Sequence, residues 1–113
     1  MSKTEEKVSQ YAQDIKSKFG ENPDMDLLRK VTKACGPSIF TKDAETVSGS
    51  NPKEMETVKK NFLIKKLGLN DDSKLDDGLN AVIEKYGKSN RNKYRAVVYY
   101  QLAKHFNRTN VFS

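Results

Sequence analysis

The chain of 113 residues contains one cysteine, Cys35, and one histidine, His105. A thiol and an imidazole could act together as a nucleophile and its general base. Cys35, however, lies at the C-terminal end of a segment expected to be helical, where the helix dipole disfavours a thiolate. One cysteine and one histidine are also too few for a tetrahedral zinc site without carboxylates. We therefore predict packing roles for both residues, with no metal.

Sequence motifs of other catalytic sites are absent as well. There is no glycine-rich phosphate loop, no HExxH pair and no nucleophile elbow. The acidic segment 70–77, NDDSKLDD, has neither the glycine nor the final glutamate of a calcium loop, so helix capping explains it better. We therefore predict a protein that is not an enzyme and that binds no cofactor.

Basic side chains are concentrated in the second half of the chain. Residues 1–57 have a net charge of −1 and residues 58–113 a net charge of +7, within an overall charge of +6. A field of this kind attracts anions. It makes residues 58–113 a candidate nucleic-acid-binding region, as an alternative to a protein partner.

Five cations of this half are candidates for binding an anion or a partner: Lys59, Lys66, Arg91, Lys93 and Arg95. Three of them are expected in the first turns of a helix, where the helix dipole disfavours positive charge, so a compensating anion is expected. That anion is either an internal carboxylate, with Asp76, Asp77 and Glu84 as candidates, or a bound ligand. Interleaved carboxylates would weaken the nucleic-acid interpretation.

Apolar spacing predicts an all-α fold, a single compact bundle of about five helices with short connections and one domain over residues 1–113. Asn22 and Asn51 each precede a proline and are expected to cap helices, while Gly68 is expected to end one. Ile39 and Phe40 are expected to plug the core. The helices are expected over about residues 8–19, 22–35, 51–66, 73–86 and 90–106.

The last helix contains more apolar surface than one face of a bundle covers. Residues 96–103 contain no charge, and such a helix is either central in a bundle or shared with a partner. The tail adds further apolar side chains. A homodimer is slightly favoured over a tail folded onto the bundle. The candidate residues for self-association are Tyr99, Tyr100, Val111 and Phe112.

Three stretches resemble a family of small bacterial proteins known only as domain of unknown function 2853. They are PDMDLLRKVT (23–32), DAETVSGS (43–50) leading to ETVKKNFLIKKLGL (56–69), and NRNKYRAVVYYQLAKHF (90–106). The resemblance covers nearly the whole chain and implies a compact all-helical protein. It implies no activity and assigns no functional residue.

A cytoplasmic location is expected. A single cysteine cannot form an internal disulfide, which fits a reducing compartment. The first ten residues lack the apolar run of a signal peptide, and no stretch reaches membrane-spanning length. We therefore predict a non-catalytic interaction domain whose partner is another protein or a second copy of itself, with no membrane contact.

Overall fold

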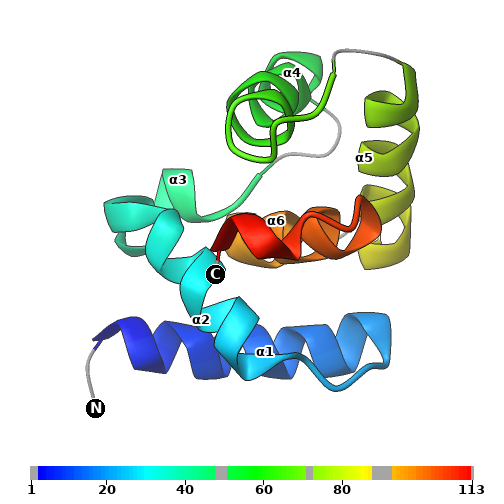
Figure 1. Ribbon diagram of the computed structural model, residues 1–113. Helices are drawn as coiled ribbons and strands as arrows, with labels where there is room; N and C mark the ends of the chain where they lie inside the picture. The colour runs from blue at the N-terminus through cyan, green and yellow to red at the C-terminus, as the bar shows by residue number, and fades with distance from the viewer. Residues whose placement is uncertain (1–2, 48–50, 71–72, 88–92, 113) are drawn as a thin grey trace.

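The computed structural model describes residues 3–47, 51–70, 73–87 and 93–112. Five main helices form the fold in these ranges, which confirms the all-α prediction (Figure 1). They are α1 (Lys3–Phe19), α2 (Met25–Ala34), α4 (Pro52–Val58) with its continuation η2 (Lys59–Ile64), α5 (Ser73–Tyr86) and α6 (Arg95–His105). The short segments η1 (Gly36–Phe40), α3 (Lys42–Glu45) and η3 (Thr109–Phe112) complete it.

Helix α6 lies at the centre of the molecule. Figure 1 shows it between α1 below and the α4–η2 helix above, with α5 at one end and α2 crossing the other. Its uncharged stretch is covered by these neighbours on nearly all sides, as expected for a central bundle helix. The buried residues of α6 are Ala96, Val97, Val98, Tyr100, Gln101, Leu102 and Ala103.

Local capping rules predicted two helix ends correctly and a third, the start of α2, incorrectly. Asn51 accepts hydrogen bonds from the N–H groups of Lys53 and Glu54, as expected. Gly68 has a φ of +71°, and the Leu69 N–H donates to the Leu63 carbonyl oxygen at 3.1 Å, which closes the helix as predicted. For α2 the prediction was wrong.

Helix α2 begins later than the Asn22-Pro23 pair suggested. Its first residue is Met25, and Asp24 is the cap, with its side chain accepting from the Leu27 N–H at 3.2 Å. The Asp24 N–H in turn donates to the Tyr100 hydroxyl at 2.8 Å. A contact with α6 therefore fixes where α2 starts.

The third helix changes its winding midway. After Val58 the π-helical segment η2 takes over, and the N–H of Lys65 donates to the Lys60 carbonyl oxygen at 3.2 Å. The N–H of Leu67 likewise donates to the carbonyl oxygen of Phe62 at 2.9 Å. Single π-type turns occur frequently at functional sites. The sequence did not predict this one.

Helix α6 begins at Arg95 rather than near Asn90. Tyr94 is extended and forms an isolated bridge with Thr46, and the Val47 N–H donates to the Lys93 carbonyl oxygen at 2.8 Å. This pairing with a distant segment delays the helix start. Lys93 therefore precedes the helix instead of lying in its first turn.

The segment η1 fills the core only in part. Ile39 is 2% exposed, as expected, but Phe40 is 50% exposed, so its expected core position is wrong. In a tight 3-10 turn adjacent side chains point in different directions, and only one of the two can face inward.

Candidate binding site

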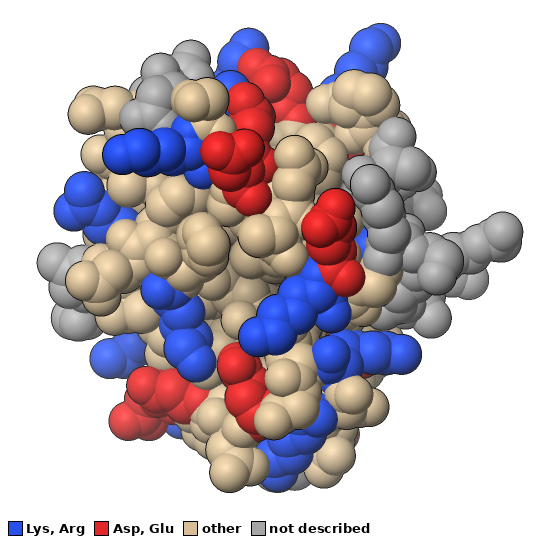
Figure 2. Space-filling view, turned by 90° about the vertical axis from the view of Figure 1, so that its right-hand side faces the viewer, with Lys and Arg blue, Asp and Glu red and all other residues tan. Residues whose placement is uncertain are grey.

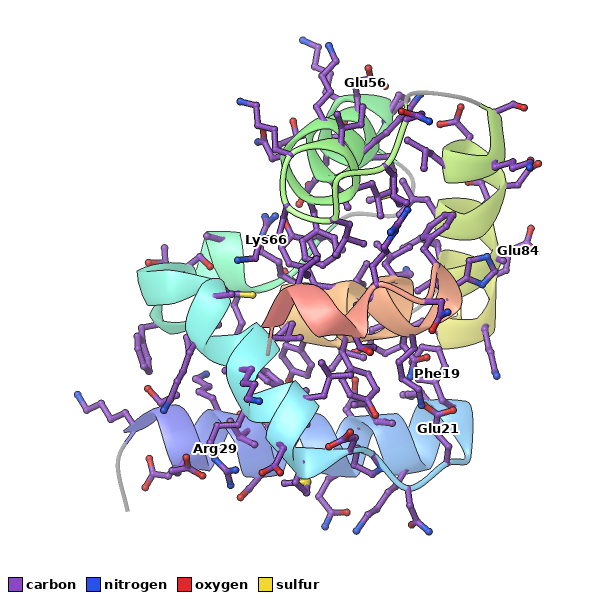
Figure 3. The ribbon with its side chains drawn as sticks, viewed as in Figure 1. Phe19, Glu21, Arg29, Glu56, Lys66 and Glu84 are labelled. Atoms are coloured by element: carbon purple, nitrogen blue, oxygen red, sulfur yellow. The ribbon has the colours of Figure 1, made fainter. Side chains whose placement is uncertain are left out.

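A recess opens between the end of α2, the segment η2 and helix α6. Its volume is about 230 Å³, and its lining residues are Ala34, Asn61, Phe62, Lys66 and Tyr99. We call it the aromatic recess. Figure 3 shows Lys66 in the space between the α4–η2 helix and α2. Two residues singled out from the sequence, Lys66 and Tyr99, therefore lie at one site.

Two stacked rings form one wall of the aromatic recess. The ring centroids of Phe62 and Tyr99 are 4.0 Å apart, with an interplanar angle of 12°. Phe62 is 4% exposed, and Tyr99 is half-buried. Stacked aromatic pairs contribute about 0.5–1.5 kcal/mol beyond their buried area. The stack therefore joins η2 to α6 and gives the recess a rigid apolar wall.

Arg95 holds Tyr99 in place from the interior side. Its Nη1 donates to the Tyr99 hydroxyl at 3.0 Å, and its Nε donates to the Ala44 carbonyl oxygen at 2.8 Å. The guanidinium also forms an ion pair with Glu54 at 3.7 Å. Planar guanidinium groups hold several acceptors at fixed angles, so Arg95 links α3, α4 and α6 around Tyr99.

The Tyr99 hydroxyl and the Cys35 thiol beside the recess both have raised pKa values. Burial raises the pKa of Tyr99 above its ordinary value, although Arg95 acts in the opposite direction. Burial also raises the pKa of Cys35 to about 12, against a smaller lowering by the charge of Arg95. A protonated thiol is a poor nucleophile. Both groups are therefore neutral near pH 7, which supports a packing role for Cys35.

The sequence-predicted cations do not share one site. Lys59 pairs with Asp76 of α5 at 3.4 Å, and Arg95 is engaged as above. Lys93 is 3% exposed, and burial lowers its pKa. Arg91 lies outside the described residues. Of the four described candidates, Lys66 is the one that lines the aromatic recess.

Internal carboxylates pair with two of these cations. Arg95, one of the three cations expected in the first turns of the last helix, pairs with Glu54, which was not among the expected partners. Asp76, which was expected to pair with that group, pairs with Lys59. Among the described residues on the face around α5, Figure 2 shows Lys and Arg side chains intermixed with Asp and Glu. This arrangement weakens the nucleic-acid interpretation.

The residues expected to mediate self-association occupy different environments. Tyr100 is fully buried in the protomer, and Tyr99 lines the aromatic recess. The tail segment η3 packs against α2, and Val111 contacts the core. The side chain of Phe112 lies outside the described part of the chain. The structure thus places Tyr100 in the interior and uses Val111 within the same protomer.

A second recess of about 250 Å³ lies beside His105. Its polar lining is largely paired internally, because Glu21 accepts from Gln101 at 2.8 Å and pairs with Lys104 at 3.5 Å. The His105 ring contacts that of Phe106 at a centroid distance of 4.9 Å. His105 itself is exposed, so its packing role stays a prediction.

The described ranges contain no group of three or more His, Cys, Asp or Glu side chains placed to hold a metal ion. In the same ranges, no helix combines the length and apolar character needed to span a bilayer.

Comparison with known families identifies the chain. The model of the family described as "Protein of unknown function (DUF2853)" matches residues 10–110. The chain belongs to this family. No curated protein matches the sequence.

The DUF2853 match includes every residue of the aromatic recess and the residues that hold Tyr99 in place. Nothing in the sequence predicted that Asn61 or Ala34 would line this site. The ring of Phe62 is buried, and its stacking on Tyr99 depends on how η2 docks on α6.

Proposed function

We propose that this DUF2853 protein is a non-catalytic binding domain that receives a side chain of a protein partner in its aromatic recess. The main support for this proposal is the stack of Phe62 on Tyr99, which forms a wall of the recess. Arg95 holds Tyr99 in this position by a hydrogen bond. Buried side-chain anchors in preformed pockets dominate the energetics of protein interfaces. A wall that is already ordered lowers the entropy cost of binding such an anchor.

The size of the recess favours a single side chain over a small-molecule ligand. Ligand pockets usually span about 300–1,000 Å³. The aromatic recess, at about 230 Å³, is smaller. It is also open at the protein surface, since Ala34, Asn61 and Lys66 on its rim are exposed. A polypeptide backbone could therefore pass over the rim while one side chain enters.

Two chemical features support a role without catalysis. The Cys35 thiol and the Tyr99 hydroxyl both have raised pKa values, so neither is an activated nucleophile or base. The unpaired thiol also fits the cytoplasmic location that we propose, where cysteines stay reduced.

Nucleic acid is the less supported partner, because Lys59 and Arg95 already contact carboxylates. Titration against mixed-sequence DNA and RNA at low salt tests it, and we expect no binding at tens of micromolar. Binding that weakens steeply with salt would favour nucleic acid instead, since phosphate contacts release counterions.

Site-specific photocrosslinking tests the protein partner. A benzophenone amino acid at exposed Asn61 should give a protein adduct in the native cell, whereas the same group at exposed Asn80 on α5 should not. Ala34→Trp, which fills the recess, should abolish the adduct. Lys33→Trp, at the exposed neighbouring position, should retain it. Absence of an adduct at Asn61, or an adduct insensitive to Ala34→Trp, would refute the proposal.

A further inference from the structure

The aromatic recess combines an aromatic wall with a side-chain amide at its rim. The wall is the stack of Phe62 on Tyr99, and the amide belongs to Asn61, the exposed neighbour of Phe62. An aromatic wall favours a ring, and an amide favours a ring that carries a hydrogen-bonding group. We infer that the side chain received by the recess is a tyrosine of the partner protein. This inference rests on the proposed function.

The preference for a ring follows from the geometry of the wall. The ring centroids of Phe62 and Tyr99 are 4.0 Å apart, and the Arg95 Cζ atom lies over the Tyr99 ring at 5.8 Å from its centroid. Beside these contacts, an added ring can meet the wall edge to face or in an offset stack, which are the arrangements that aromatic pairs prefer. A ring therefore gains more free energy at this wall than an aliphatic side chain that buries the same area.

The preference for a hydroxyl group follows from Asn61. This residue lines the recess, and its side-chain amide forms no hydrogen bond with another described residue. The Tyr99 hydroxyl, in contrast, already accepts a hydrogen bond from Arg95 at 3.0 Å. An amide can both donate and accept a hydrogen bond, as a phenol hydroxyl can, whereas an indole N–H only donates. Asn61 therefore favours tyrosine over phenylalanine and tryptophan.

Peptide selection tests this inference on the full chain. Random dodecapeptides displayed on phage are selected on the immobilised wild-type protein, after depletion on the Ala34→Trp variant, in which the recess is filled. We expect the enriched peptides to share a tyrosine. Fluorescence anisotropy of an enriched peptide then gives affinities for variants of the peptide and of the protein.

The hydroxyl and the ring of this tyrosine each have their own expected effect. Replacing the tyrosine of the peptide by phenylalanine removes only the hydroxyl and should weaken binding about two- to tenfold, the range of one hydrogen bond. This difference should vanish on Asn61→Ala and persist on Asn80→Ala, at an exposed asparagine of α5. Replacing that phenylalanine by cyclohexylalanine keeps a six-membered ring without π electrons and should weaken binding by a further factor of about two to ten.

The outcomes separate the inference from the proposed function. Enriched peptides that bind through an aliphatic residue, phenylalanine or tryptophan would overturn the inference and leave the binding domain intact. A preference for tyrosine over phenylalanine that survives Asn61→Ala would overturn it too, as would equal affinities of the phenylalanine and cyclohexylalanine peptides. If no peptide depends on the aromatic recess, both the inference and the proposed function fail.

Discussion

The rings of Phe62 and Tyr99 stack with a centroid distance of 4.0 Å, although the two residues belong to different helices. This contact connects stability to the candidate function. Phe62 belongs to the hydrophobic core, and Tyr99 packs against the same core. The wall of the aromatic recess is thus an edge of the core, held by the same interactions that dock η2 onto α6.

Phe62→Ala should lower the free energy of unfolding by about 3 kcal/mol, because it removes a ring that is 4% exposed and leaves a cavity. Urea denaturation followed by circular dichroism measures the change. Phe40→Ala is the matched control, since that ring is 50% exposed and its removal should cost less than about 0.5 kcal/mol. A loss below about 1 kcal/mol for Phe62→Ala would show that the ring does not support the core.

Gly78→Ala should be destabilising, although alanine normally favours a helix interior by about 1 kcal/mol. A Cβ at Gly78 would lie 2.3 Å from the Phe106 ring and 2.9 Å from the His105 ring. Overpacking of this kind costs about 1–3 kcal/mol. Thermal or urea denaturation of the variant measures the cost.

Asn80→Ala on the same helix is the control for Gly78→Ala, because its exposed side chain contributes little to packing, and its effect should stay within about 0.5 kcal/mol. Phe106→Ala should make Gly78→Ala less costly, since it removes the clashing ring. Stabilisation by Gly78→Ala alone would contradict the close approach of α5 and α6.

Local sequence signals predicted much of the fold. Ser73–Tyr86 was predicted at its observed bounds, because a one-sided apolar pattern and a following glycine are local features. Asn51 and Gly68 also act as expected. The late start of α6 could not be predicted in this way, because it depends on Tyr94 pairing with distant Thr46.

The candidate site was predictable only in part. The sequence singled out Lys66 for anion or partner binding and Tyr99 for self-association. That both line one recess depends on how the helices pack. The ion-pair partner of Arg95 could not be predicted from the sequence either. The sequence suggested Asp76, Asp77 or Glu84 as its partner, whereas the observed partner is Glu54 of α4. Both the lining of the recess and the partner of Arg95 depend on contacts between residues far apart in the sequence, which residue spacing does not predict.

Cys35 should make stability depend on pH above about 8.5. Its pKa is about 12 in the folded protein, against about 8.5 for an unperturbed thiol. Above pH 8.5 the unfolded chain therefore binds fewer protons than the folded one, so the free energy of unfolding falls as pH rises toward 12. Between pH 8 and pH 10 this linkage amounts to about 1–2 kcal/mol.

The measurement for Cys35 is urea denaturation at pH 8 and pH 10 for the wild type and for Cys35→Ala. Tyr86, whose pKa is raised without a contribution from Cys35, affects both proteins alike. The Cys35 charge makes a smaller contribution to the raised pKa values of Tyr11 and Tyr99, so the difference between the two profiles reports the thiol together with its coupling to these two tyrosines. The wild type should lose more stability than the variant over this interval. Parallel profiles would mean that the thiol titrates normally in the folded protein.

Two of the four residues that the sequence suggested for a homodimer have roles within the protomer. Tyr100 is fully buried, and its hydroxyl accepts a hydrogen bond from the Asp24 N–H at 2.8 Å. The tail segment η3 packs on α2, with Val111 against the core. These apolar groups therefore need no second chain to cover them.

Sedimentation equilibrium across a concentration series should accordingly give the monomer mass up to several hundred micromolar. A dimer mass that rises with concentration would contradict this expectation. In that case Ala34→Trp and Lys33→Trp would locate the interface, because both residues are exposed neighbours on α2 and only Ala34 lines the aromatic recess. A dimer weakened by Ala34→Trp alone would identify a second copy of the chain as the occupant of the recess.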